Sequence, residues 1–336
     1  MEDTSPLRAV VIGGGSGLSA LLQGLKHFAR QGDPAVPAMD ITAIVTVTDD
    51  GGSSGRLRRE FDVLPPGDIR NCMVALSEDS ALLSRLFQYR FSSGRGLKGH
   101  SFGNLFLMAL TQIMGDFPEA VRVSSEVLKI AGRIYPSTTD DVALEATLAD
   151  GTKVVGETRI SRTRQRIRRV RLIPRKARPL AAALAAIDEA DVITLGPGSL
   201  FTSVVPNLLV DGVAAAIQRS QASRAYFVNL MSQPGETTDF LASDHIRALH
   251  LHAGRKFLDY AVVNIRPLTS AVKKRYAREE AKPVENDIDT ILKMGVKVLA
   301  GNLAQRGEKV RHESLTAAAV ILKLAQEARR RKNGQP

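Results

Sequence analysis

The sequence of 336 residues contains one cysteine, no tryptophan, 11 phenylalanines and 5 tyrosines. Because Cys72 is the only cysteine, neither an intrachain disulfide nor a cysteine-based zinc site can form within the chain. Cys72 lies in the helical apolar pattern of residues 69–76, where we expect a buried small side chain rather than a nucleophile. The scarcity of cysteine favours a protein of a reducing compartment.

Long apolar runs are also missing, since none approaches the roughly 18 residues that a membrane-spanning helix needs. The first residues, Met1 to Pro6, are polar and acidic, and they lack the basic and apolar regions of a signal peptide. The apolar share of 44% is ordinary for a folded domain in water. We therefore expect a cytoplasmic protein with no membrane span.

Positive charge is abundant, with a formal net charge of +11, but it is concentrated in one segment. Residues 159–178, which we call the arginine ribbon, contain ten Lys or Arg and no acid, and without these ten the net charge would be +1. No aromatic side chain alternates with these cations to stack on bases, so nucleic acid is not a predicted partner. A solvated basic surface is the favoured interpretation, and a patch that faces an anion or a nucleic acid is the alternative.

Three glycine-rich loops each follow an apolar strand pattern. Backbone N–H groups of glycine can approach an anion closely, and a helix N-terminus adds a positive dipole. Such loops at the carboxyl ends of strands are typical of a nucleotide site in an open α/β sheet, and we expect all three to meet at one cleft. The candidate ligand-binding residues in the first, second and third loops are Gly13, Gly14, Gly15, Ser16 and Gly17; Asp49, Asp50, Gly52, Ser53 and Ser54; and Gly196, Gly198 and Ser199.

The order of the apolar patterns predicts an α/β protein with a Rossmann-like, doubly wound and mostly parallel sheet. The expected strands of this sheet are residues 8–12, 41–48, 192–195, 225–230, 260–264 and 297–299, with helices between them, one of which is residues 207–219.

The pattern changes at Tyr135, where a smaller antiparallel unit is expected. Its strands are residues 142–148, 153–160 and 167–173, and Asp150-Gly151 is a hairpin turn between the first two. We therefore assign residues 1–134 and 177–336 to a Rossmann-like nucleotide-binding domain and residues 135–176 to an inserted β-meander. The arginine ribbon would lie on this insert, away from the glycine loops.

The first and third loops do not match a standard catalytic or nucleotide motif. Leu18 occupies the position of the third glycine of the dinucleotide fingerprint, and no Gly-Lys-Ser/Thr follows as in a P-loop. Phosphate contact is the favoured role of the first loop, and a tight strand-to-helix turn is the alternative. The third loop is not a nucleophile elbow, because Phe201 stands where that motif needs glycine.

The second loop begins with the acid pair Asp49 and Asp50. A carboxylate beside a phosphate site usually holds Mg²⁺ or binds a ribose hydroxyl, so both residues are candidate metal ligands. The alternative is a solvated acidic turn that caps a helix. Arg56 could balance phosphate charge, and Asn71 and Asn104 could bind a base or sugar edge or simply cap helices.

Five segments together resemble the YvcK-like group of the CofD family. They are residues 11–17, 46–58, 65–71, 100–105 and 195–207, and the likeness extends over about residues 7 to 325. The resemblance implies a Rossmann-like fold that binds UDP-N-acetylglucosamine or a related nucleotide sugar. It also implies a bacterial regulatory protein, a gluconeogenesis factor, that links central carbon metabolism during gluconeogenic growth to cell-wall synthesis and cell shape. Tyr276 resembles a ligand-stacking tyrosine of that group, and Arg311 resembles a basic ligand contact.

The enzymatic members of the same family are 2-phospho-L-lactate transferases, which move a phospholactyl group from a guanylyl donor to a deazaflavin. Their second loop has an Asp pair without the Gly-Gly-Ser-Ser-Gly run of residues 51–55, and this difference favours a UDP-sugar binder. A transferase that moves a phospho-linked group from a nucleotide donor stays the alternative, and catalytic residues are unassigned. The resemblance implies an unidentified protein partner and, beyond Mg²⁺ bound with the nucleotide sugar, no cofactor. It leaves a homodimer open.

Overall fold

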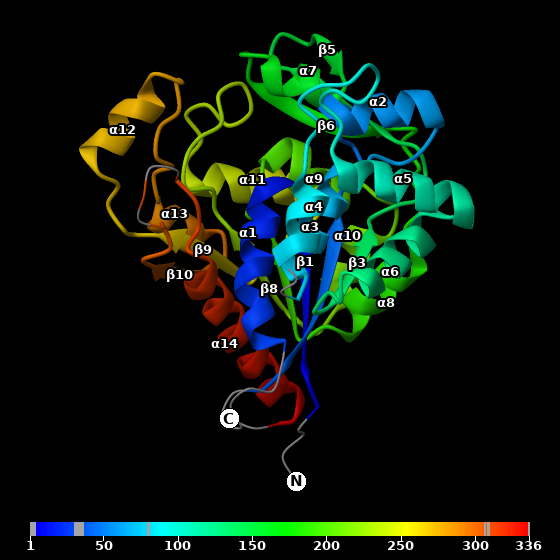
Figure 1. Ribbon diagram of the computed structural model, residues 1–336. Coiled ribbons are helices and arrows are strands. Elements are labelled where there is room, and N and C mark those ends of the chain that lie inside the picture. Colours follow the sequence, from blue (N-terminus) through cyan, green and yellow to red (C-terminus); the bar gives the residue numbers. More distant parts are fainter. Residues whose placement is uncertain (1–4, 30–36, 79–80, 306, 308–309, 335–336) are drawn as a thin grey trace.

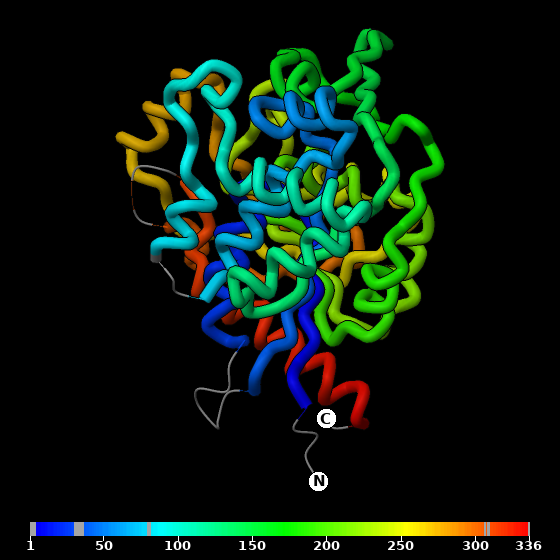
Figure 2. Tube along the Cα trace, turned by 45° about the vertical axis from the view of Figure 1, so that its right-hand side comes forward, coloured from blue at the N-terminus to red at the C-terminus, as the bar shows by residue number. Residues whose placement is uncertain are grey.

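The computed structural model describes residues 5–29, 37–78, 81–305, 307 and 310–334. Figures 1 and 2 show a large parallel sheet covered by helices, with a smaller antiparallel unit at the top and both ends of the chain at the bottom. The glycine loops lie between the large sheet and the small unit.

The main sheet confirms the predicted doubly wound α/β fold. Its strand order is β10-β9-β8-β7-β1-β2-β3, and all neighbouring pairs are parallel. From β1 the chain adds β2 and β3 on one side, and it later adds β7, β8, β9 and β10 on the other side. The boundary between β1 and β7 is therefore the topological switch point of the sheet. The strands are β1 (Leu7–Gly13), β2 (Met39–Val45), β3 (Arg133–Pro136), β7 (Val192–Leu195), β8 (Ser223–Phe227), β9 (Tyr260–Asn264) and β10 (Lys297–Gly301).

Two groups of helices pack against the sheet. In one group α1 contacts α3 and α14, and in the other α10 contacts α8 and α9. Helix α1 buries one apolar stripe, made of Leu18, Leu21, Leu22 and Leu25. The helices of the main domain are α1 (Gly15–Leu25), α2 (Gly52–Phe61), α3 (Gly67–Leu76), α4 (Ala81–Gln88), α5 (Phe102–Met114), α6 (Phe117–Val127), α8 (Ala181–Glu189), α9 (Val205–Leu208), α10 (Val213–Arg219), α11 (Ala242–Ala253), α12 (Ser270–Ala277), α13 (Ile288–Lys293) and α14 (Ser314–Lys332).

The inserted antiparallel unit is also confirmed, but the expected meander is wrong, because β6 pairs with β4 and not with β5, which makes β4 the central strand. The predicted strand 153–160 is wrong at its second half, which forms helix α7. Gly156 turns the chain there with a φ of 101°, and the Asp50 carboxylate accepts hydrogen bonds from the first turn of α7. The elements of the insert are β4 (Ala143–Leu148), β5 (Lys153–Val155), α7 (Glu157–Arg162) and β6 (Ile167–Ile173).

The expected helix 207–219 is interrupted. A π-helical turn, η2 (Leu200–Val204), leads into the short helix α9, and Gly212 then breaks the path with a φ of 80° before α10 begins. Since π-helical turns are frequent at functional sites, their occurrence beside the third glycine loop is notable. The strand expected at 41–48 ends at Val45, and residues 133–136 add an unpredicted strand, β3, to the main sheet.

In the described part of the chain, no single helix is long and apolar enough to cross a membrane. Segments Leu200–Leu208 and Val213–Arg219 reach that length only together, and they are bent by 75° relative to each other.

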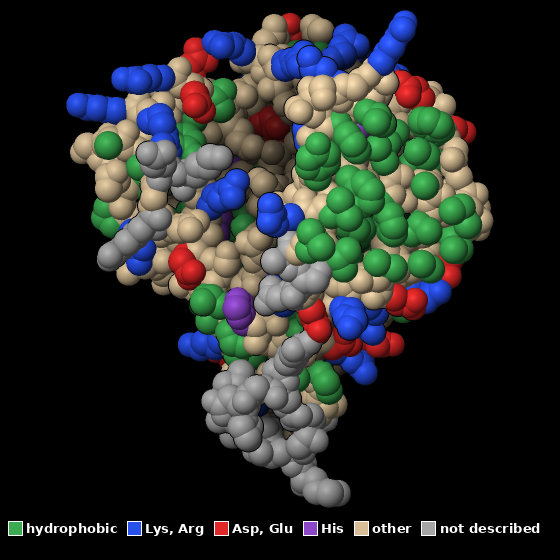
Figure 3. Space-filling model, viewed as in Figure 1, with side chains coloured by type: hydrophobic (Ala, Val, Ile, Leu, Met, Phe, Trp, Pro, Cys, Tyr) green, Lys and Arg blue, Asp and Glu red, His purple; other side chains and the backbone are tan. Residues whose placement is uncertain are grey.

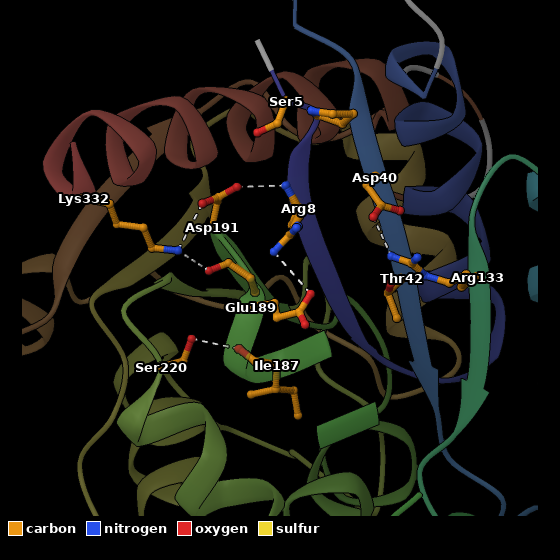
Figure 4. Close-up of polar contacts among 12 residues, drawn as sticks. Ser5, Arg8, Asp40, Thr42, Arg133, Ile187, Glu189, Asp191, Ser220 and Lys332 are labelled. Carbon is orange, nitrogen blue, oxygen red and sulfur yellow. Dashed lines mark hydrogen bonds and ion pairs between the residues drawn. The ribbon is translucent and has the colours of Figure 1, made fainter. Parts of the chain in front are cut away.

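The amino ends of the strands are held together by charged side chains (Figure 4). Asp191, which precedes β7, accepts hydrogen bonds from the backbone N–H of Arg8 on β1 and from Arg329 and Lys332 at the end of α14. The cations lie at the C-terminal end of a helix, where they also offset its dipole. This contact fixes the last helix of the chain to the first strand.

Candidate functional site

The first and third glycine loops touch each other at the switch point of the sheet. The backbone N–H of Gly196 donates to the carbonyl of Ile12, 2.9 Å away. A Cβ atom at Gly17 would lie 2.5 Å from the carbonyl oxygen of Pro197, so only glycine permits this approach. Gly15, the first residue of α1, has a φ of 66°, which also favours glycine. The two loops and the start of α1 therefore form one continuous wall.

This wall borders a cavity of about 650 Å³, a size suited to a small-molecule ligand. Figure 3 shows the molecule hollowed between the part that carries α12 and the helices on the right, with acidic atoms visible inside the hollow. The loops after β1, β7 and β8, helix α7 of the insert, the α12 region and the chain before α14 supply its lining. Among the lining residues are Gly14, Gly15, Ser16, Gly17, Pro197, Gly198, Ser199, Ser203, Asn229, Gln233, Glu236, Tyr276, Arg311 and His312.

Polar side chains from the loop after β8 contact the third glycine loop beside the cavity. Gln233 donates to the hydroxyl of Ser199 at 2.6 Å, and Asn229 donates to Gln233 at 3.4 Å. His312 is buried, and burial lowers its pKa to about 4, so its ring is neutral at pH 7. Its Nε2 atom has no hydrogen-bond partner in the described structure. A neutral acceptor of this kind in a cavity wall can bind a ligand N–H or O–H.

Carboxyl groups gather behind the glycine loops. Burial raises the pKa of Glu236 to about 7, although the N–H of Phe201 and the hydroxyls of Thr202 and Ser161 partly oppose the shift. Burial and the charge of Asp49 raise the pKa of Asp68 to about 6, against a hydrogen bond from the N–H of Gly15.

Glu157, from the insert, extends this group. Burial, followed by the charges of Asp49 and Asp68, raises its pKa well above the usual range. Its Oε2 accepts a hydrogen bond from the hydroxyl of Thr48 at 3.4 Å. Such concentrations of perturbed carboxyl groups are typical of functional sites rather than of surfaces.

The acid pair of the second loop points in two directions. Asp49 accepts from the N–H of Gly51 at 2.9 Å, and Asp50 accepts from the N–H and hydroxyl of Thr158 at 2.8 and 2.6 Å. Asp50 therefore caps helix α7 of the insert, a different helix from the one that follows it in sequence. The expectation that the insert lies away from the glycine loops is wrong, because Thr158 contacts the second loop and Ser161 lines the cavity.

The other candidates near the second loop lie outside the lining of the cavity. They bind neighbouring protein groups. Ser53 contacts His100 at 3.1 Å, Asn104 donates to Ser54 at 3.4 Å, and Arg56 donates to the carbonyl of Lys98 at 2.9 Å. Asn71 accepts from Arg70 at 2.6 Å. The structure thus brings the first and third loops together at the cavity, while the second loop stands behind them.

Tyr276 and Arg311, which come from distant parts of the sequence, both line the cavity. The hydroxyl of Tyr276 accepts from the N–H of Val310 at 3.0 Å, and the guanidinium of Arg275 lies 5.1 Å from its ring centroid. This hydrogen bond connects α12 to the segment that carries Arg311. Arg311 itself is exposed and makes no ion pair among the described residues, so its charge is available to an anion.

Sequence reasoning missed the part of the site that follows β8. The loop after β8 contains Asn229, Gln233 and Glu236. Ligands bind beyond the carboxyl ends of the strands in open α/β sheets, so the position of this loop was a signal that it belongs to the site. Ser161 and His312 had no local signal, because only the packing of the insert and of the last segment brings them to the cavity. Within the described residues, no three His, Cys, Asp or Glu side chains come together to hold a metal ion.

The fold and the paired glycine loops define a Rossmann-like α/β protein with a ligand cavity at the topological switch point. Residues 9–304 match the family described as 2-phospho-L-lactate transferase CofD, and the chain belongs to that family.

Several similar proteins carry another name within this family. The chain is 44% identical to the gluconeogenesis factor of Bacillus subtilis, over 95% of this chain and 98% of the relative. It is 46% identical to the gluconeogenesis factor of Halalkalibacterium halodurans, over 93% and 95%. A crystal structure of a protein from Bacillus halodurans superposes with a TM-score of 0.90 at 45% identity, covering 95% of this chain and 100% of that one.

Proposed function

We propose that the protein is a gluconeogenesis factor that binds a nucleotide sugar, UDP-N-acetylglucosamine in the first place, and acts as a cytoplasmic regulator. It would link gluconeogenic carbon metabolism to cell-wall synthesis and cell shape through a protein partner. The observation that carries the proposal is the wall formed by the first and third glycine loops, whose backbone borders a cavity large enough for such a ligand. The names of the relatives support the gluconeogenic role.

The cavity offers different chemistry to the three parts of a nucleotide sugar. The N-terminus of α1, at Gly15 to Gly17, suits a diphosphate, and Arg311 can add a charge-assisted contact. Tyr276 offers an aromatic surface to uracil, which is worth about 1–3 kcal/mol for base stacking. Gln233 and Asn229 can bind sugar or ribose hydroxyls.

Calorimetric titration with UDP-N-acetylglucosamine, UDP-glucose, GDP and UMP tests the proposal. We expect the UDP sugars to bind more tightly than UMP, since they can contact both the glycine loops and the polar side chains of Asn229 and Gln233. Gly17→Ala places a methyl group against Pro197 and should abolish binding, whereas Gly254→Ala, at a helix end outside the cavity, should leave binding unchanged in folded protein. Equal affinity for all four ligands, or none, would contradict the proposal.

The alternative is a transferase of a phospho-linked group from a nucleotide donor, which the family name favours. Phosphorus NMR of the protein with UDP-N-acetylglucosamine or GDP conjugates and Mg²⁺ separates the two. A binder leaves the ligand spectrum unchanged over hours, whereas a transferase produces new phosphorus signals.

Mg²⁺ enters the proposal only as a companion of the ligand diphosphate, with Asp49 of the second loop, which stands behind the residues that line the cavity, as its candidate carboxylate. Mg²⁺ commonly takes one or two carboxylates plus phosphate oxygens, so the absence of a three-ligand cluster in the described structure is compatible with this mode. Asp50 already accepts hydrogen bonds from the N–H and the hydroxyl of Thr158, so its role is structural. Asp49→Asn should therefore reduce the Mg²⁺-dependent gain in UDP-sugar affinity, while Asp50→Asn should mainly lower thermal stability. Affinity that does not depend on Mg²⁺ in the unmodified protein would remove the metal from the proposal.

A further inference from the structure

The arginine ribbon borders a second cavity, at the junction between the insert and α11. This cavity has a volume of about 650 Å³, which is enough for a small molecule. Figure 3 shows Lys and Arg side chains along the top of the molecule, where the insert lies. Among the described residues, none lines both this cavity and the one at the glycine loops, so the two cavities are separate.

The buried part of the lining, which we call the floor, is largely apolar; it consists of Ile167, Phe201, Phe240, Ala248 and His252. The ring of Phe201 packs edge to face against Phe240, with centroids 6.1 Å apart, and against His252, with centroids 5.7 Å apart. The Nε2 atom of His252 accepts from the N–H of Val170 at 3.0 Å, and its Nδ1 atom contacts the carbonyl of Ala248 at 2.7 Å. These contacts hold β6 against α11, so the cavity has a firmly packed base.

The exposed part of the lining, which we call the rim, is cationic. Its three arginines are Arg166, Arg168 and Arg247. The carboxylate of Asp244, also in the lining, pairs with Arg247 at 2.7 Å, whereas Arg166 and Arg168 make no ion pair among the described residues. The guanidinium of Arg166 lies 5.4 Å from the ring centroid of Phe240, at the border between rim and floor. Two positive charges beside an aromatic surface are therefore available to a ligand.

This combination of charge and apolar surface defines the chemistry of that ligand. A guanidinium binds carboxylate, sulfonate or phosphate oxygens through parallel N–H groups. An apolar body next to the anionic group would cover Phe240 and Leu251, which is 56% exposed at the rim. An inorganic anion would leave this surface in water, and a neutral apolar molecule would leave the arginines unpaired. Only a ligand with both parts uses the whole cavity.

We propose that the second cavity binds a small organic anion with an aromatic or apolar body. The anionic group contacts Arg166 and Arg168, and the body lies against Phe240 and Leu251. The middle of the arginine ribbon, which has no part in nucleotide-sugar binding, thereby acquires a ligand of its own. The site does not depend on the nucleotide-sugar proposal, since the two cavities share no lining residue among those described.

Calorimetric titration with naphthalene-2-sulfonate is the first test. Sulfate serves as the probe for charge without a ring, and 2-naphthylmethanol as the probe for a ring without charge. We expect the sulfonate to bind with a dissociation constant below about 1 mM and about tenfold or more tightly than either partial probe. Its affinity should fall as salt is added, because the rim arginines are exposed. Equal affinity for the sulfonate and a partial probe, or no binding of the sulfonate, would overturn the proposal.

Substitutions in the ribbon test the position of the anionic group. Arg166→Gln and Arg168→Gln should each weaken sulfonate binding about fivefold or more, with an unchanged circular dichroism spectrum. Arg175→Gln, at another exposed arginine of the ribbon that lies outside the lining, is the matched control and should keep the affinity. Equal losses in the three variants would show that the ribbon attracts anions only through its overall charge, which contradicts a built site.

A substitution at the rim tests the position of the apolar body. Leu251→Glu places a carboxylate beside the arginines and should abolish sulfonate binding in folded protein. Leu292→Glu, on α13, is the matched control, because Leu292 is 52% exposed and lies outside both cavities. Binding retained in Leu251→Glu would overturn the proposal.

The glycine-loop cavity is the competing location for an aromatic anion, and a last arm tests it. Excess UDP-N-acetylglucosamine and the Tyr276→Ala substitution should both leave sulfonate affinity unchanged. Competition by the UDP sugar, or lost binding in Tyr276→Ala, would place the probe at the glycine loops and overturn the second site. A UDP sugar that fails to bind in its own titration contradicts the proposed function and not this site.

Discussion

Buried carboxyl groups lie near both ends of the strands of the main sheet, which we call its amino edge and its carboxyl edge. The surroundings of these carboxyl groups differ. At the amino edge, the side chain of Asp191 is 3% exposed and accepts from Arg329 at 2.6 Å and from Lys332 at 3.1 Å. Burial by itself would raise the pKa of Asp191, but hydrogen bonds from Arg329, the Arg8 amide and Lys332 outweigh it, and the pKa is lowered. This carboxylate is charged and holds three elements together.

At the carboxyl edge, Glu236 is equally buried but makes no ion pair among the described residues. Its hydrogen-bond partners, the N–H of Phe201 and the hydroxyl of Thr202, are uncharged, and burial raises its pKa to about 7. The same chemical group therefore serves stability at one edge and is left with a perturbed pKa beside the cavity at the other. A fold that needed only stability would not bury such a group without a cation.

The strongest test of this comparison is removal of the paired carboxylate. Asp191→Asn removes the buried carboxylate that Arg329 and Lys332 both contact, and we expect the free energy of unfolding to fall by about 3–5 kcal/mol. Urea denaturation measures the change. Asp188→Asn, which breaks the exposed pair with Arg219, is the control and should cost under about 1 kcal/mol. Equal losses in the two variants would remove the distinction between the two kinds of pair.

The two edges should also respond to pH in opposite directions. The folded pKa of Glu236, about 7, exceeds its ordinary value of 4.5, so its contribution to stability is complete below about pH 4.5 and is lost as the pH rises through 7. The lowered pKa of Asp191 means that its contribution is present above its unfolded pKa and is lost as the pH falls through the lowered value. Glu236→Gln should therefore flatten the decline in stability between pH 4.5 and 8, by up to roughly 3 kcal/mol.

Denaturation of the ligand-free protein at several pH values measures this slope. Glu279→Gln, at an exposed residue that also lines the cavity, should keep the slope of the unmodified protein. A slope that Glu236→Gln leaves unchanged would show that Glu236 is not protonated by folding.

Ligand contacts at the carboxyl edge should affect affinity more than stability. Tyr276→Ala should weaken UDP-N-acetylglucosamine binding about tenfold or more, because it removes the stacking surface. Tyr276→Phe keeps the ring and loses only the bond to Val310, so it should retain most of the affinity. Calorimetry of both variants, with melting curves of the ligand-free forms, separates the roles. If Tyr276→Ala loses stability but binds normally, the ring has a packing role alone.

The smallest effect is expected from the arginine ribbon. Arg164 pairs with Glu280 on the surface, and the guanidinium of Arg166 lies over the ring of Phe240. Changing Arg164, Arg166 and Arg168 to Ser should change UDP-sugar affinity by less than about threefold, because exposed pairs contribute little. Arg311→Ala removes a single charge at the cavity and should have the larger effect in the same titration. The reverse order would place the ribbon in the binding site.

Much of the fold could be predicted because its signals are local. The apolar runs at 9–12 and 192–195 are strands buried on both faces, and the glycines after them turn the chain into the next element. The hairpin at Asp150-Gly151 was likewise visible from turn chemistry. The end of the strand pattern at residue 156 was not, because Asp50, more than a hundred residues earlier, caps the helix that forms there.

The sequence by itself determined six of the seven strands of the main sheet, the glycine loops and the family to which the chain belongs, since each depends on residues close together in the chain. Only the tertiary structure decided which loops share a cavity, because the strand order sets β1 beside β7 while the second loop is drawn toward the insert. It also decided the charge states of Asp191 and Glu236. Both are buried acidic residues, and what differs is whether distant parts of the chain bring cations or only neutral donors to them.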